Sequence, residues 1–294
     1  MITAINKKKT EWSNCLYIIV PLIVVIIIMV IPFFRTIYYS FTRFDGFHPP
    51  TFIGLKNYIS LGGNPHFLSA IKNNFTISLA LPIWVGLPLV LAVLLFQNPG
   101  RLLKTARMTI MFPVALSMSV TGIIFNSFFS YYGPINAVLS NMGLKFAPVD
   151  WLSNPRIAMI LIITTAIWKD FGVLTVIFLA GLSNLNKELI EASRIDGANK
   201  FQEFFHIIIP QLNPIIVFIV AITLISNYKS MFDYVYSLTQ GGPGFATQTI
   251  EFLLYNEAFR FLNMGFASAL GVLMFVFIVI ITYFQIKTMS RSDA

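Results

Sequence analysis

Six long apolar stretches constrain the fold of this chain more than any other feature of its sequence. They are approximately Leu16–Phe34, Phe75–Phe96, Met108–Phe129, Ile157–Leu182, Ile215–Tyr236 and Met264–Ile286. Each supplies the roughly 20 helical residues that are needed to cross about 30 Å of hydrocarbon. A strand of a membrane β-barrel would instead alternate in polarity over about 10 residues. We therefore predict an all-α membrane protein with six transmembrane helices.

The shortage of charge points to the same solvent. Only 11% of the residues are charged and 56% are hydrophobic, whereas soluble domains are about 25% charged. A disordered chain would combine low hydrophobicity with high charge. The lysines and arginines behind the net charge of +8 are scattered between the apolar stretches, unlike the one-sided cluster of a nucleic-acid-binding domain. These observations argue against a soluble enzyme, a disordered chain and a nucleic-acid-binding domain.

The sequence offers no constellation of catalytic or metal-binding residues. Cys15 is the only cysteine, and His48, His66 and His206 lie far apart in the sequence, unlike the ligands of a metal site. The Gly-x-x-x-x-Gly-Lys-Ser/Thr loop that cradles a nucleotide is also missing. We therefore predict a non-catalytic chain without metal or cofactor. If ATP drives its function, another chain must bind and hydrolyse the ATP.

Positive residues between the stretches predict the orientation, because such residues in short loops are retained in the cytoplasm. With the amino terminus inside, eleven lysines and arginines fall on the inner side and seven on the outer side. The inner set is Lys7, Lys8, Lys9, Arg101, Lys104, Arg107, Lys187, Arg194, Lys200, Lys287 and Arg291, and the outer set is Arg35, Arg43, Lys56, Lys72, Lys145, Arg156 and Arg260. Both termini are thus expected in the cytoplasm, as tails 1–15 and 290–294 that flank one six-span domain, 16–289.

The loop between the fourth and fifth stretches, residues 184–214, is the only inner loop that is long, charged and helical in pattern. Asn186 is placed to cap a helix over Lys187–Ile195, where apolar residues recur at helical spacing. An Asp-Gly turn follows, and a second helix over Lys200–Ile209 is expected to end at Pro210. The loop is therefore predicted to form a helix-turn-helix at the membrane surface.

The physics of this loop alone leaves two roles open. It can be an amphipathic hairpin that lies in the membrane interface and merely completes the connection. Alternatively, it docks into a groove of a cytoplasmic partner. The small side chains of Ala192 and Ser193 would then allow close approach, and Gly197 would permit the bend.

The residues of the loop resemble the EAA signature of the ABC-importer permeases, E-A-A-x3-G-x9-I-x-L-P. Glu191-Ala192-Ser193, Gly197 and Ile207 to Pro210 stand at the spacing of this signature. A serine replaces its second alanine and an isoleucine its leucine, and both replacements keep size and character.

The resemblance extends over nearly the whole chain, to the carbohydrate-uptake permeases and among them to the maltose-permease-F-like half. Phe52–Tyr58 is similar to their F-x-G-L-x-N-Y, Asp196-Gly197-Ala198 to D-G-A, Phe232-Asp233 to F-D, and Leu238–Pro243 to L-T-x-G-G-P. The resemblance implies a passive translocation subunit in a bacterial cell membrane. Its partners would be a second homologous permease, two ATPase subunits and an external sugar-binding protein.

The resemblance also places the loop on the cytoplasmic side, as a coupling helix that passes ATPase closure on to the spans. Glu191 is expected to pair with a cationic group of the ATPase, or within its own helix with Lys187 or Arg194. The ATPase-coupling residues implied in this way are Glu191, Ala192, Ser193, Asp196, Gly197, Ala198, Ile207 and Pro210.

Four charged side chains fall inside the predicted spans. Lys169 and Asp170 lie near mid-membrane and must face protein or water, because exposing either to lipid costs at least about 2.5 kcal/mol. Adjacent residues on a helix point about 100° apart, so these two need other partners, whereas Lys229 and Asp233 are spaced to pair directly. Such charges either hold helices together or line a pathway.

Sugar recognition needs aromatic faces together with hydrogen-bonding amides and acids, and the fourth and fifth stretches contain that mixture. The predicted pathway residues are Trp168, Lys169, Asp170, Asn227, Tyr228, Lys229 and Asp233. The alternative function is a self-sufficient secondary transporter in which Lys169, Asp170 or Asp233 relays protons. That alternative predicts inverted repeats, which the sequence does not display.

Overall fold

The computed structural model describes residues 17–97, 100, 105, 108–144 and 148–292. The predicted tail 1–15 lies outside this part of the chain. The chain forms two compact units. The first contains the residues up to Gly63 together with Leu254–Leu273, and the second contains Asn64–Leu253 and the residues from Met274 onward.

The first unit begins with a helix over Tyr17–Ser40, which contains the π-helical segment η1 (Ile26–Val30) and α2 (Ile31–Ser40). The short strands β1 (Thr42–Arg43) and β2 (Thr51–Phe52) then pair antiparallel. The remaining elements of this unit are α3 (Lys56–Gly62), the π-helical segment η5 (Asn256–Arg260) and the beginning of α15 (Met264–Ser292).

The F-x-G-L-x-N-Y motif ties this unit together where the first helix ends. The side-chain amide of Asn57 donates hydrogen bonds to the carbonyl oxygens of Ser40 and Thr42, both at 2.9 Å. The hydroxyl of Tyr58 donates to Ser40 Oγ at 2.7 Å. A helix leaves its last carbonyls without partners, so the motif stabilises the exit of the chain from its first span.

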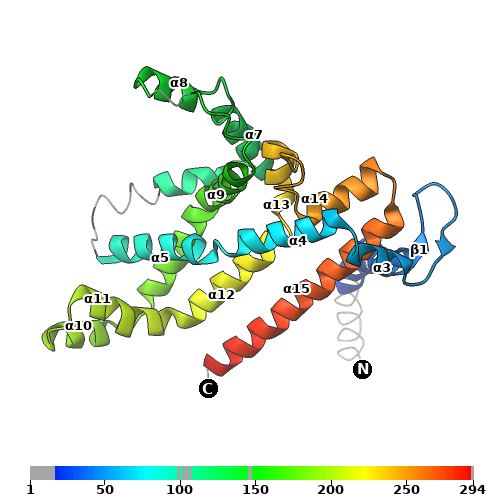
Figure 1. Ribbon diagram of the computed structural model, residues 1–294. Coiled ribbons are helices and arrows are strands. Elements are labelled where there is room, and N and C mark those ends of the chain that lie inside the picture. The colour runs from blue at the N-terminus through cyan, green and yellow to red at the C-terminus, as the bar shows by residue number, and fades with distance from the viewer. Residues whose placement is uncertain (1–16, 98–99, 101–104, 106–107, 145–147, 293–294) are drawn as a thin grey trace, which may run out of the picture. The chain divides into compact units, whose positions relative to one another are not determined.

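The second unit contains the other helices (Figure 1). They are α4 (Pro65–Ser78), α5 (Leu81–Gln97), the 3-10 turn η2 (Phe112–Ala115), α7 (Met118–Phe128), α8 (Pro134–Asn141), α9 (Pro155–Ser183), α10 (Lys187–Ile195), α11 (Lys200–Glu203), the π-helical segment η3 (Phe204–Ile208), α12 (Ile209–Asn227), α13 (Met231–Tyr234) and the π-helical segment η4 (Val235–Thr239). Helices α14 (Ile250–Tyr255) and α15 belong to both units.

Five helices of the described chain are long and apolar enough to cross a membrane. They are Tyr17–Ser40, Pro65–Gln97, Pro155–Ser183, Lys200–Asn227 and Met264–Lys287. A bent helix pair in the region of the third apolar stretch makes the sixth if it is counted as one span. The predicted all-α membrane fold is confirmed.

The third span is broken. Met108–Ala115 and Met118–Phe128 meet at an angle of 100°. Leu116 is extended, and the Ser117 side chain caps the new helix by accepting from the backbone N–H of Val120. Pro113 stands in the 3-10 turn before the break, where its ring and missing N–H disfavour a regular α-helix. The apolar stretch therefore concealed a sharp turn.

The fifth span does not follow the predicted range Ile215–Tyr236. Its helix ends at Asn227, and a turn over residues 228–230 leads into α13. Asparagine and serine compete with the helix for backbone hydrogen bonds, and the Asn74 side chain donates to the carbonyl oxygen of Asn227 at 3.3 Å. The end of the predicted span was therefore wrong, because it followed hydrophobicity across a polar turn.

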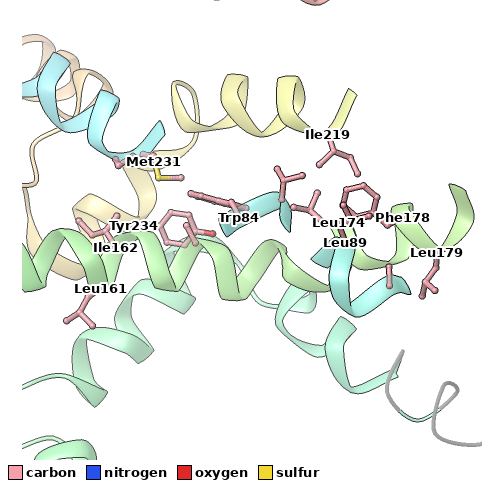
Figure 2. Close-up of a cluster of buried hydrophobic side chains, with 14 of the residues drawn as sticks. Trp84, Leu89, Leu161, Ile162, Leu174, Phe178, Leu179, Ile219, Met231 and Tyr234 are labelled. Carbon is pink, nitrogen blue, oxygen red and sulfur yellow. The ribbon is translucent and has the colours of Figure 1, made fainter. Parts of the chain in front are cut away.

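The core of the second unit lies between α5 and α9, with α12 packed against both. Trp84, Ile162, Phe178 and Ile219 are each at most 1% exposed and belong to one apolar cluster (Figure 2). Lipid tails are as apolar as these side chains, so close packing rather than transfer from water holds such helices together.

Candidate coupling hairpin and intramembrane polar site

Both arms of the helix-turn-helix begin with an asparagine cap. The Asn186 side chain accepts from the backbone N–H of Glu188 at 2.9 Å, and α10 runs over the predicted residues 187–195. In the second arm, Asn199 and Gln202 form a reciprocal capping box at the start of α11. Such caps satisfy N–H groups that the first turn of a helix leaves free. Local sequence alone therefore defines where each arm starts.

The turn between the arms depends on Gly197, whose φ of 83° lies in the left-handed region. The N–H of Ala198 bonds to the carbonyl of Ser193 at 2.9 Å, and that of Gly197 to the carbonyl of Arg194 at 3.2 Å. These two bonds define the Schellman motif that closes many helices. Glycine suits the position because other residues pay a steric penalty in this conformation.

An ion pair joins the two arms across the turn. Arg194 donates from Nε to Glu203 Oε2 at 2.8 Å and from Nη2 to Glu203 Oε1 at 2.9 Å. The side chain of Glu203 is 3% exposed and that of Arg194 is 56% exposed. The hydrogen bond to Glu203 and its negative charge raise the pKa of the Arg194 guanidinium above its ordinary value. A bidentate pair of this kind fixes geometry as well as adding energy.

The predicted pair between Glu191 and Arg194 is not formed. Glu203 occupies the guanidinium instead, because the turn brings α11 beside the end of α10. Glu191 is exposed and makes no ion pair within the part of the chain that the structure describes. Its carboxylate therefore points away from the clamp and remains available at the surface of the hairpin.

The hairpin presents apolar side chains together with the signature residues. Leu189, Ile195, Phe201 and Phe205 are 51%, 86%, 75% and 48% exposed. The positions of the predicted coupling residues are as follows: Glu191, Ala192, Asp196, Gly197 and Pro210 are exposed, Ala198 and Ile207 are half-buried, and Ser193 is buried with its hydroxyl bonded to the carbonyl of Ile190. Exposed apolar surface rimmed by polar groups marks an interaction surface.

The second arm of the hairpin does not end at Pro210, contrary to the prediction. α11, η3 and α12 form one continuous helix over Lys200–Asn227. The N–H of Ile209 bonds five residues back, to the carbonyl of Phe204. This widened π-helical turn precedes the proline, and such bulges accommodate irregularity within a continuing helix. The arm and the fifth span are thus one rod.

Replacing Arg194 with methionine is expected to destabilise the hairpin by about 1–2 kcal/mol, because the buried Glu203 carboxylate loses its charged partner. The half-exposed position of Arg194 keeps the effect below that of a fully buried pair. Hydrogen exchange of the backbone amides in residues 187–209 measures the change. Lys200→Met serves as the control, because it removes a positive charge from the same hairpin without breaking the bidentate pair. Equal exchange in the two variants would contradict the clamp.

Within the spans, Lys169 lies against the broken third span. It is 8% exposed, and its Nζ donates to the carbonyl oxygens of Val114 at 3.3 Å and Pro113 at 3.5 Å. The 3-10 turn there leaves these carbonyls outside a regular helical ladder. A buried ammonium and unpaired backbone oxygens thus satisfy each other, as the membrane interior requires.

The two intramembrane acids have partners other than the predicted ones. The indole Nε1 of Trp84 donates to Asp170 Oδ2 at 3.3 Å, and the hydroxyl of Ser119 donates to Asp233 Oδ1 at 2.8 Å. The predicted pair between Lys229 and Asp233 is absent among the described ion pairs. The turn after Asn227 removes the helical spacing on which that pairing depended.

The other candidate pathway residues divide by exposure. Trp168 is 36% exposed, and its ring lies 5.2 Å from that of Phe125 between centroids. Lys229 is exposed as well. Asn227 and Tyr228 are 0% and 8% exposed, and neither polar side-chain atom of Asn227 has a hydrogen-bond partner in the described chain. The structure therefore does not gather all seven residues around one cavity.

Sequence reasoning missed the partners Trp84 and Ser119 and the backbone carbonyls of the third span. Tryptophan and serine are common in apolar helices, and nothing in the spacing links Trp84 to Asp170, 86 residues away. Pro113 is the one signal that could have indicated free carbonyls, because proline interrupts the helical ladder.

The fold and the hairpin together define a multi-pass membrane permease that presents a docking surface on a polar loop. Residues 70–291, more than half of the chain, match the family described as binding-protein-dependent transport system inner membrane component. The chain belongs to this family, and the resemblance to ABC-importer permeases is confirmed.

Relatives and a solved structure agree over nearly the full length. The probable ABC transporter permease protein YurN of Bacillus subtilis is 33% identical, covering 92% of this chain and 93% of its own. The multiple sugar-binding transport system permease protein MsmF of Streptococcus mutans is 32% identical, covering 98% and 99%. A chain of a bacterial alginate ABC transporter, solved in complex with an alginate pentasaccharide-bound periplasmic protein, has a TM-score of 0.82 at 23% identity, covering 94% and 93%.

Proposed function

We propose that this chain is the permease subunit of an ATP-driven, binding-protein-dependent carbohydrate importer in a bacterial cell membrane. It forms half of the translocation pathway, beside a second homologous permease. Two cytoplasmic ATPase subunits drive it, and an extracytoplasmic binding protein delivers the sugar. The family membership, the sugar system of MsmF and the periplasmic protein of the alginate transporter support these partners.

The observation that carries the proposal is the continuity of the hairpin with a span. The second arm runs unbroken from Lys200 to Asn227, about 42 Å at 1.5 Å per residue. The Arg194–Glu203 pair locks the first arm to this rod. A partner that grips the exposed apolar side chains of α10 and α11 therefore moves the end of the fifth span. Closure of the ATPases would be converted in this way into a rigid-body change of the permease.

The pathway follows from the same movement. The rod ends at Asn227, next to Tyr228 and the turn that carries Lys229. Asn227 and Tyr228 are buried in this conformation, whereas Trp168 and Lys229 are exposed. Displacement of the rod would uncover the amide of Asn227 and the ring of Tyr228, which suit the hydroxyls and the apolar face of a sugar. Lys169 and Asp170 would keep α9 packed while the rod moves.

Reconstitution of the complete transporter tests this function. Proteoliposomes that contain the chain with its second permease, ATPases and binding protein are expected to accumulate a sugar only with ATP inside and binding protein outside. Vesicles with this chain alone are expected to show no uptake, with or without a proton gradient. Proton-driven uptake by the chain alone would establish the secondary transporter instead. A complete complex that accumulates only non-carbohydrate solutes from a broad panel would overturn the sugar class.

A further inference from the structure

A cavity of about 480 Å³ lies between α4 and α9, near the end of each helix that the charge count places on the outer side. The amino-terminal turns of α9 form one wall, and the middle of α4 forms the other. The lining residues are Ser69, Lys72, Asn73, Thr76, Pro155, Arg156, Met159, Ile160, Ile163 and Ala246.

Two cations stand at this cavity without an acidic partner. Lys72 and Arg156 are both exposed, and neither side chain makes an ion pair within the described residues. None of the ten lining residues is acidic. Two positive charges that share a cavity without neutralisation attract an anion.

The polar neighbours of these cations are already engaged. The hydroxyl of Ser69 donates to the carbonyl of Phe245 at 3.2 Å, and the amide of Asn73 donates to the carbonyls of Phe245 and Gln248 at 3.0 and 2.9 Å. The cavity therefore offers charge but few free groups for the hydroxyls of a sugar.

The rest of the wall is apolar and extends along the membrane-spanning part of α9. Met159, Ile160 and Ile163 lie four to eight residues beyond Pro155, which corresponds to roughly 6–12 Å of helix. Ile160 is 58% exposed. A compact, fully hydrated anion would leave this apolar wall in contact with nothing, whereas an acyl chain would cover it.

We propose that this cavity binds an anionic glycerophospholipid, with its phosphate between Lys72 and Arg156 and the start of an acyl chain against Met159, Ile160 and Ile163. The long stems of both cations can follow apolar surface while their charged ends reach the headgroup level. Basic pockets between transmembrane helices recognise anionic lipid headgroups in this manner.

Photo-crosslinking tests the site in the purified complex that contains the full-length chain, reconstituted in vesicles. A phosphatidylglycerol with a diazirine in its acyl chain is expected to label peptides from residues 69–76 and 155–163. A matching phosphatidylcholine is expected to label them weakly. Each basic residue near an anionic lipid contributes a factor of roughly five, so Lys72→Gln with Arg156→Gln should lower the phosphatidylglycerol labelling about tenfold or more.

Arg260→Gln is the matched control, because Arg260 is also an exposed outer cation but does not line the cavity, and its labelling should equal that of the unchanged chain. Thermal unfolding midpoints show that the variants remain folded. Labelling that ignores the double substitution, or that is equal for phosphatidylcholine, would overturn the proposal. Competition by soluble glycerol phosphate or galacturonate at millimolar concentration would assign the cavity to a free phosphate or a sugar acid. A lack of label in both segments would show that a protein subunit covers the cavity.

Discussion

Replacing Gly197 with valine is expected to lower ATP-driven uptake by the complete transporter at least tenfold while leaving the chain folded in the membrane. The Schellman turn holds Gly197 at a φ of 83°. An ordinary L-residue costs roughly 1–2 kcal/mol in that conformation and a β-branched one more, and about 1.4 kcal/mol is already a factor of ten in an equilibrium. The strain would displace α10 from α11 and so separate the docking surface from the fifth span. Uptake and ATPase activity in proteoliposomes measure the loss.

Gly197→Asn separates backbone strain from volume. Asparagine is close to valine in size but adopts the left-handed conformation readily, and a Cβ at this position has no atom within 4 Å. This variant is therefore expected to retain most of the uptake. Equal losses in both variants would assign the effect to side-chain volume against the partner. Normal uptake in Gly197→Val would contradict the coupling role of the hairpin.

The hairpin was predictable because its signals are local. Asn186 caps its helix from two residues away, and the turn needs only Gly197 and the residues around it. The bidentate pair was not predictable in the same way, because Arg194 and Glu203 are nine residues apart and meet only once the turn has formed. Local preference defined the two arms, and their assembly selected the ion pair.

Within the membrane, the sequence predicted that spans exist but not where they break. Hydrophobicity is blind to backbone geometry, so the 100° bend after Pro113 and the turn after Asn227 both fell inside uniform apolar stretches. The partners of Lys169 are backbone oxygens, which have no side-chain signature. Burial of that lysine could be argued from energy alone, but its site depends on the bend.

The bend and the buried lysine also explain why α9 carries a glycine three residues after Lys169. A Cβ at Gly172 would overlap the carbonyl oxygen of Ile110 and press on the backbone of Met111. α9 therefore packs directly on the backbone of the third span, and this approach lets Lys169 reach the carbonyls of Pro113 and Val114. Small residues commonly permit such close contact between membrane helices.

Gly172→Ala is accordingly expected to destabilise the chain by more than about 3 kcal/mol, because the obstacle is backbone that cannot rotate aside and overpacking against even mobile neighbours costs about 1–3 kcal/mol. The variant should fail to yield a monodisperse complex on size exclusion, and uptake should be lost with it. Gly86→Ala is the matched control: Gly86 also lies within a spanning helix, but its Cβ would meet nothing within 4 Å. That change should leave the unfolding midpoint equal or slightly raised, since alanine favours helix over glycine by up to about 1 kcal/mol. If Gly172→Ala assembled and melted like Gly86→Ala, α9 could not pack against the third span as closely as the lysine–carbonyl contact requires.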